Sequence, residues 1–124
     1  MKKSKFYSKI KNENQMIEMG KLILTTDGVQ QMLKISKYQI RIVNYINPQK
    51  DEILKENQAI CGVNNRSTKT IDISVTSHIN SSIAFLTETI AHEIAHIVHF
   101  NHSKEHKKFT NQIKKVIKSD LGIL

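Results

Sequence analysis

The chain has 124 residues and a formal net charge of +8 at pH 7, with 39% hydrophobic side chains. This length suits one domain with a small core, so we expect residues 1–124 to form a single, monomeric domain. The one cysteine, Cys61, excludes an intramolecular disulfide. No run approaches the roughly 20 apolar residues of a membrane span, and no apolar run follows the basic start as in a signal peptide. We therefore expect a cytoplasmic protein without membrane contact.

The first half of the chain reads as helical segments followed by one strand. Residues 1–11 carry five lysines, and we expect them to form a flexible basic arm. Residues 12–24 and 27–36 have mostly helical patterns, with Asp27 as a candidate cap for the second. An alternative for residues 22–26 is a strand that enters a turn. Residues 40–46 are rich in β-branched side chains, which predicts a strand.

The second half predicts a hairpin and two helices. Residues 50–58 form a polar connection with at most one helical turn. Residues 59–63 and 70–76 read as strands joined by a hairpin loop at 64–67. A helix should follow, capped by Asn80 or Ser81 and running to about Phe100.

The last predicted helix covers residues 104–118. It places Phe109, Ile113, Val116 and Ile117 on one face and lysines on the other. On the preceding helix, Ile90, Ile94, Ile97 and Val98 are expected to pack inward. These elements predict an α+β fold in which a short, mostly antiparallel sheet packs on these two helices.

Residues 92–96 read His-Glu-Ile-Ala-His, the HExxH pattern. Positions i and i+4 share one face of a helix, so His92 and His96 can aim ring nitrogens at one metal ion. Glu93 then lies beside the open position of the metal, where a carboxylate can deprotonate a water molecule. This arrangement indicates a zinc hydrolase with Zn²⁺ as cofactor. The alternative is an amphipathic helix with incidental surface histidines.

His99 shares the face of the first two histidines but is a poor third ligand. It lies about 10 Å along the helix axis from His92, whereas ligand atoms lie about 2 Å from zinc. We expect His99 to line the cleft or to donate a hydrogen bond to a ligand.

The third ligand must come from a residue after the end of the helix. Asn101 tolerates the left-handed conformation that ends helices, and Ser103 can cap a new helix. His102 then lies in the corner between the two helices and is our predicted third ligand. His106, one turn further on, is the alternative.

The stretch HEIAHIVHFNHSKEHKKF, residues 92–109, resembles the core of SprT-like, YgjP-like and WLM-type zinc metalloproteases. The resemblance covers residues 59–117 and implies a small zincin core. It implies that His92, His96 and His102 bind zinc, that Glu93 is catalytic, and that Phe109 is the family aromatic. Metzincins share the histidine spacing but require glycine where His99 stands.

The predicted function is that of a zinc metalloendopeptidase acting on protein or peptide substrates, with Glu93 as general base. The alternative is a basic nucleic-acid-binding or regulatory module with a structural zinc ion. Glu93 favours the enzyme, because a structural site has no use for a carboxylate there. The sequence does not reveal a second group, besides zinc, that could stabilise the oxyanion of the tetrahedral intermediate by donating a hydrogen bond. His99, His78 or a tyrosine are the candidates.

The lysines are unevenly distributed, since six of them lie within residues 104–118. A basic face attracts polyanions, which makes DNA or RNA a candidate partner. The resemblance points the same way, because SprT-like and WLM proteases are associated with the degradation of proteins crosslinked to DNA.

Overall fold

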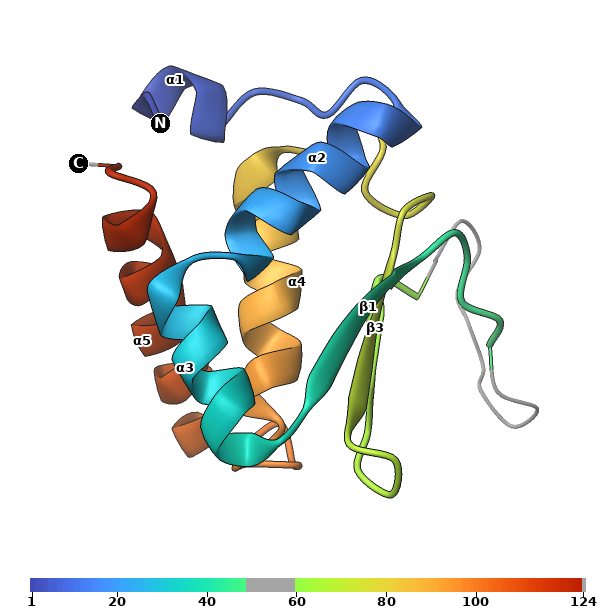
Figure 1. Ribbon diagram of the computed structural model, residues 1–124, viewed down its shortest axis with the longest axis vertical. Coiled ribbons are helices and arrows are strands. Elements are labelled where there is room, and N and C mark those ends of the chain that lie inside the picture. Colours follow the sequence, from blue (N-terminus) through green and yellow to red (C-terminus); the bar gives the residue numbers. More distant parts are fainter. Residues whose placement is uncertain (49–59, 124) are drawn as a thin grey trace.

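The computed structural model describes residues 1–48 and 60–123, and the helices of this part lie on one side of a three-stranded sheet (Figure 1). The predicted connection at 50–58 lies outside the described residues, and so does Ala59. The α+β class is confirmed. The helices are α1 (Lys3–Phe6), α2 (Glu13–Leu24), α3 (Asp27–Ser36), α4 (Ile83–Ala95) and α5 (Lys104–Asp120), and the strands are β1 (Gln39–Val43), β2 (Gly62–Asn65) and β3 (Thr70–Ser74).

Serine and asparagine side chains cap three of the helices. The Oδ1 atom of Asn12 accepts a hydrogen bond from the Gln15 amide, Ser82 accepts one from the Phe85 amide, and Ser103 caps α5 as predicted. The cap of α4 is thus Ser82, and neither Asn80 nor Ser81. Likewise α3 begins after Thr26, with Asp27 inside its first turn. The helix α2 continues to Leu24, which excludes the alternative strand at 22–26.

The helix α4 ends at Ala95, earlier than the predicted end near Phe100. The amides of Ile97 and Val98 bond carbonyls three residues back, at Ile94 and Ala95, so the helix tightens into a turn. This early end exposes Val98, which was expected to pack inward and is 59% exposed. The residues after Ala95 are thereby free to turn back toward the last turn of α4.

The sheet is mixed, with strand order β1-β3-β2. The β2–β3 hairpin is antiparallel, as predicted, but its turn falls at 66–69 and Lys69 adopts a left-handed conformation (φ 53°). The other pairing, β1 with β3, is parallel, whereas a mostly antiparallel sheet was expected. The sequence pattern can predict a hairpin between neighbouring strands. It does not predict that β1 pairs with β3, because these strands are far apart in the sequence.

The predicted flexible arm at residues 1–11 is wrong. Phe6 and Ile10 are buried, with 2% and 0% of their surface exposed. The amide of Ile10 donates to the Ser81 carbonyl, so this segment is tied to the start of α4. The prediction rested on the five lysines. A high local charge does not prevent a segment from packing through its few apolar residues, here Phe6 and Ile10.

The helix α4 lies at the centre of the fold and carries the predicted site. Its buried residues face the sheet on one side and α5 on the other (Figure 1). From α5, Ile113 and Ile117 complete the core, while Val116 is 43% exposed, contrary to expectation. None of the helices in the described part of the chain has the length and hydrophobicity of a membrane span.

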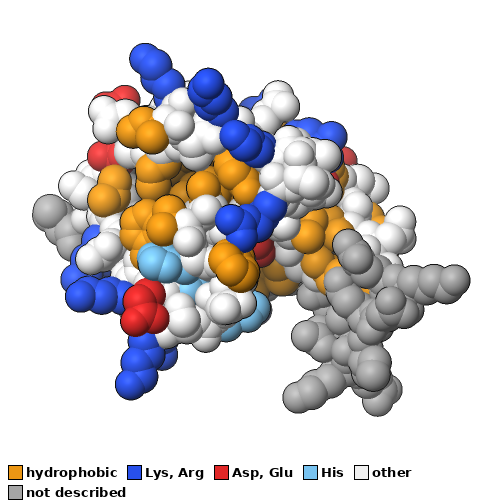
Figure 2. Space-filling view, turned by 90° about the horizontal axis from the view of Figure 1, so that it is seen from below, with side chains coloured by type: hydrophobic (Ala, Val, Ile, Leu, Met, Phe, Trp, Pro, Cys, Tyr) orange, Lys and Arg blue, Asp and Glu red, His pale blue; other side chains and the backbone are white. Residues whose placement is uncertain are grey.

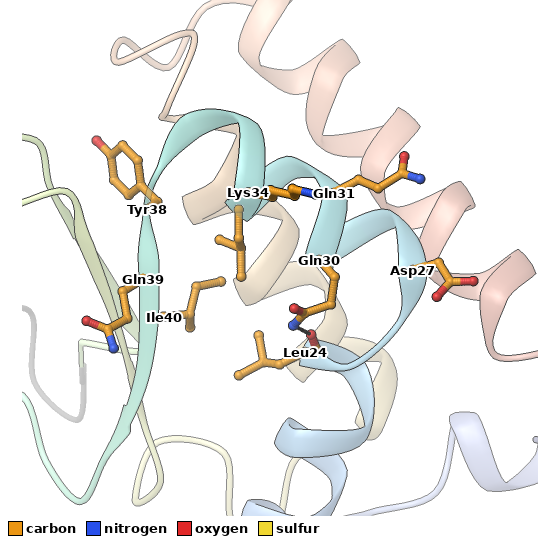
Figure 3. A pocket seen from close by; sticks show the side chains of 9 residues that line it. Leu24, Asp27, Gln30, Gln31, Lys34, Tyr38, Gln39 and Ile40 are labelled. Carbon is orange, nitrogen blue, oxygen red and sulfur yellow. Dashed lines mark hydrogen bonds between the residues drawn. The ribbon is translucent and has the colours of Figure 1, made fainter.

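A surface groove of about 650 Å³ separates α3 from β1. Figure 3 shows its apolar floor, formed in part by Leu24 and Ile40, and its rim of polar side chains such as Gln30. No histidine and no acidic residue of the HExxH stretch lines it. Its size alone therefore gives no reason to place the chemistry there.

Candidate metal centre

The last turn of α4 brings the first two histidines together. His92 lies in the helix and His96 at its C-terminal cap, one turn later. Their Nε2 atoms are 3.1 Å apart. The i, i+4 spacing therefore places both nitrogens at one point, as the sequence predicted.

His102 reaches the same point from the corner between α4 and α5. Its Nε2 atom lies 3.2 Å from the Nε2 atoms of both His92 and His96. An imidazole nitrogen has one in-plane lone pair or hydrogen, which cannot serve two partners at once. The triangle is therefore not a set of three hydrogen bonds. Its sides are close to the roughly 3.4 Å that separates ligands bound tetrahedrally at 2.0–2.1 Å.

The backbone orients the ring of His96. Its Nδ1 atom lies 2.9 Å from the carbonyl oxygen of His99, which can only accept a hydrogen bond. Nδ1 must therefore carry the hydrogen, which leaves the lone pair on Nε2, inside the triangle. Burial lowers the pKa of His96. Burial, and then the neighbouring histidines, lower the pKa of His92 to about 4, so both rings are neutral at pH 7 and can donate lone pairs.

Two further histidines, His99 and His106, lie next to these three. His99 contributes its carbonyl, while its ring packs edge-on against Phe109 at 5.9 Å. His106 is buried, stacks on His96 with ring centroids 4.0 Å apart, and its Nε2 lies 3.0 Å from the His92 carbonyl. Donor nitrogens of His92, His96 and His106 also lie within 4.8 Å of one another. That set is wider than the Nε2 triangle, and one nitrogen of His106 is already engaged by a carbonyl.

Glu93 is buried beside the histidines, with 8% of its surface exposed. Burial raises the pKa of its carboxyl group to about 7. Its backbone carbonyl accepts a hydrogen bond from Nδ2 of Asn64 at 3.0 Å, and Oδ1 of Asn64 accepts one from the Tyr38 hydroxyl. These bonds tie β2 to α4 at the residue that carries the carboxylate.

The family model of the WLM domain matches residues 2–121. The chain belongs to the WLM domain family. This is a zinc-metalloprotease-like family and a close relative of the SprT-like proteases. The resemblance seen in the sequence is therefore confirmed, and it extends over nearly the whole chain. Comparisons with curated proteins and with solved structures found no match.

The WLM domain thus combines metallopeptidase-like family membership with histidines close enough to bind a metal ion. Figure 2 views the end of the molecule where α4 ends and α5 begins. Histidine side chains reach the surface there, among hydrophobic side chains and lysine or arginine side chains. His78, a candidate donor in the sequence, is not part of this surface, because it is fully buried and both its ring nitrogens have partners.

Two hollows flank the histidine triangle of the WLM domain. One, of about 340 Å³, is lined by β2, the turn after it and the helix end: Gly62, Val63, Asn64, Arg66, Glu93, His96, Phe100 and His102. The other, of about 350 Å³, lies toward the start of α5. Only the first contains Glu93, so it is the side on which a substrate can meet both the carboxylate and the histidines.

Gly62 allows β2 to approach the side chain of Glu93. This role of Gly62 was not predicted from the sequence. A Cβ atom on Gly62 would lie 3.0 Å from Cγ of Glu93 and 3.2 Å from side-chain atoms of Ile73 and Thr89. A glycine in a strand often marks such a close approach, and that signal was available in the sequence.

We expect Gly62→Ala to displace the Glu93 side chain by a few tenths of an ångström. For a hydrolase that uses Glu93, this displacement predicts a roughly tenfold lower turnover, because catalysis is sensitive to such displacements, with metal content unchanged. Gly20→Ala is the matched control, since its Cβ would crowd Ile42, away from the site. Equal turnover in the two variants, measured at equal metal content, would show that the Gly62 contact has no catalytic role.

Proposed function

We propose that this WLM domain is a zinc-dependent metallopeptidase that hydrolyses peptide bonds, with Glu93 as general base. The observation that carries the proposal is the convergence of three imidazole Nε2 atoms, 3.1–3.2 Å apart, beside a buried carboxylate. In this proposal His92, His96 and His102 hold the zinc ion. Three imidazoles are a ligand set that suits zinc and leaves one position open.

Bound zinc would lower the pKa of a water molecule toward 7 and polarise the substrate carbonyl. The chain supplies the proton transfers. The Glu93 carboxylate accepts a proton as the water attacks the carbonyl carbon, and then delivers it to the leaving nitrogen. Burial raises the pKa of Glu93 to about 7 when no cation is bound. A cation on the neighbouring histidines would lower this pKa and favour the ionised form, which is the form that accepts the proton.

The alternative with a purely structural zinc ion requires a closed, four-ligand site. His106 is the nearest candidate for a fourth ligand, but its Nε2 atom is directed at the His92 carbonyl. On the other side, the hollow beside Glu93 is open to solvent through the exposed residues Arg66, Phe100 and His102. These features favour a site with a position open to substrate.

The proposal is tested by metal content and hydrolysis in the same preparation. Purified protein should contain about one zinc ion per chain and should cleave an unfolded general protein substrate. Removal of the metal with a chelator should abolish cleavage, and added zinc should restore it. Cleavage that persists in protein shown to be metal-free would exclude a metallopeptidase.

We also propose that the face formed by the lysines of α5 binds DNA or RNA without sequence preference. Lys104, Lys107, Lys108 and Lys115 are exposed on this helix. Of the ion pairs in the described part of the chain, only the one between Lys114 and Glu88 involves a lysine of this helix. Most of the positive charge of this face is therefore available to phosphates.

Affinity for a random-sequence duplex should fall steeply with salt, with a log–log slope of about −4 to −5 for four to six phosphate contacts. The double variant Lys107→Gln, Lys108→Gln should reduce that slope by about two. Lys21→Gln with Lys34→Gln, on α2 and α3, removes the same charge elsewhere and serves as control. A slope that changes equally in both double variants would mean that no particular face is used.

A further inference from the structure

Arg66 lies at the rim of the hollow that contains Glu93, His96 and His102. It belongs to the turn after β2 and is exposed. Its guanidinium carbon lies over the Phe100 ring, 4.5 Å from the ring centroid, and Phe100 comes from the segment between α4 and α5. The two segments that flank the hollow are thus joined by a cation–π contact. Such a contact uses the face of the aromatic ring and leaves N–H groups of the guanidinium available for hydrogen bonds.

The charge of Arg66 has no partner within the described residues. The ion pairs there join Arg41 to Asp72 and Lys114 to Glu88, and no hydrogen bond from the Arg66 guanidinium is found in residues 1–48 and 60–123. Arg41, the other arginine of the chain, differs in this respect. It donates two hydrogen bonds to the Asp72 carboxylate, at 2.8 and 3.0 Å.

Phe100 orients the guanidinium. Its ring is 61% exposed and lines the same hollow as Arg66, so the contact holds the guanidinium at the edge of that hollow. A guanidinium held there, with no acidic partner within residues 1–48 and 60–123, can bind a planar anion. The fork of N–H groups on arginine matches the two oxygens of a carboxylate.

We propose that Arg66 binds a carboxylate of the substrate, so that the enzyme prefers peptides with a carboxylate close to the scissile bond. This inference rests on the proposed function and names its substrate class. The carboxylate belongs either to an Asp or Glu side chain or to the C-terminus of the peptide. Because Arg66 and Glu93 line the same hollow of about 340 Å³, a carboxylate held at the rim keeps the adjacent peptide bond next to the base and the histidines. Phe100 acts as a positioning residue for the guanidinium.

Peptide binding tests the inference separately from catalysis. The zinc-loaded full chain carrying Glu93→Gln is titrated, at about 0.15 M salt, into three fluorescent peptides of one length. The first is neutral with an amidated end, the second has one internal Glu and an amidated end, and the third is neutral with a free C-terminus. The titrations are repeated with Arg66→Gln added, and with Lys69→Asn added. Lys69→Asn removes the same charge from the same turn, outside the hollow, and asparagine tolerates the left-handed conformation found there.

We expect one of the two carboxylate peptides to bind at least about tenfold more tightly than the neutral one, a difference of about 1.4 kcal/mol. Arg66→Gln should remove this preference, and Lys69→Asn should keep it. A gain with the internal Glu identifies a side-chain carboxylate, and a gain with the free end identifies the C-terminus. Equal binding of all three peptides, or a preference lost equally in both variants, would overturn the inference. The same peptides offered to the enzyme with Glu93 intact then report on hydrolysis, so a failure of the proposed function is visible separately.

Discussion

Replacement of Glu93 by glutamine is expected to lower turnover by at least about 10²-fold while zinc content and melting temperature stay nearly unchanged. Glutamine keeps the size and polarity of the side chain but cannot accept a proton at neutral pH. The three converging nitrogens come from histidines, so loss of this carboxylate removes no proposed ligand.

The environment of Glu93 explains why the fold should tolerate this change. The side chain is 8% exposed, and its pKa of about 7 means that the neutral form already has a large population in the absence of a cation. A neutral amide of the same shape therefore fits the same pocket at little cost in stability. The bond from Asn64 to the backbone carbonyl of residue 93 does not depend on the side chain.

The measurement pairs kcat on a general protein substrate with zinc content for wild type and Glu93→Gln. His92→Ala is the control in which metal and activity should be lost together. Activity that survives Glu93→Gln but not His92→Ala would indicate zinc hydrolysis with a different base. A structural zinc site predicts no hydrolysis in either form, so cleavage by the wild type is itself decisive against it.

The second large effect concerns the metal ligands. His92→Ala or His96→Ala should abolish zinc binding, and His102→Ala should weaken it sharply, because each supplies one of three nitrogens that meet within 3.2 Å. Zinc affinity can be measured by competition with a chromogenic chelator. The change in melting temperature on zinc addition gives an independent measure, since a ligand stabilises the state that binds it.

His99 and His106 provide the matched controls. His99→Ala should leave zinc affinity within a few-fold, because His99 contributes its backbone carbonyl and not its ring. His106→Gln removes a ring that stacks on His96 and contacts the His92 carbonyl, and it should cost about 10- to 100-fold, as is usual for residues that orient ligands. If His106→Gln lost zinc completely while His102→Ala kept it, the third ligand would be His106.

The sequence alone was sufficient for the features that depend on local geometry. Helical spacing places His92 and His96 on one face, with Glu93 next to them, and these positions follow from 3.6 residues per turn. The cap at Ser103 likewise starts α5 directly after His102, which places His102 in the corner between two helices. The predicted helix stop at Asn101 is wrong in detail, because α4 already ends at Ala95 and Asn101 does not adopt a left-handed conformation. The helical spacing and the cap are short-range properties, so the chain encodes them within a dozen residues.

Tertiary structure decided the features that depend on contacts between distant segments. The parallel pairing of β1 with β3 and the burial of Phe6 and Ile10 follow from packing against partners far away in sequence. No periodicity reports such partners, because a pattern shows which face is apolar and not what covers it.

The residues that surround the candidate metal centre also depend on contacts between distant segments. Gly62, Asn64 and Arg66 come from a hairpin about 30 residues before Glu93, and only the packing of β2 on α4 brings them to the histidines. The sequence by itself therefore determined the candidate metal ligands and the candidate base, through one helix and its end. The tertiary fold decided which strand lies against the candidate base and which cation borders the hollow beside it, because burial of apolar surface determines which segments pack together and local spacing does not.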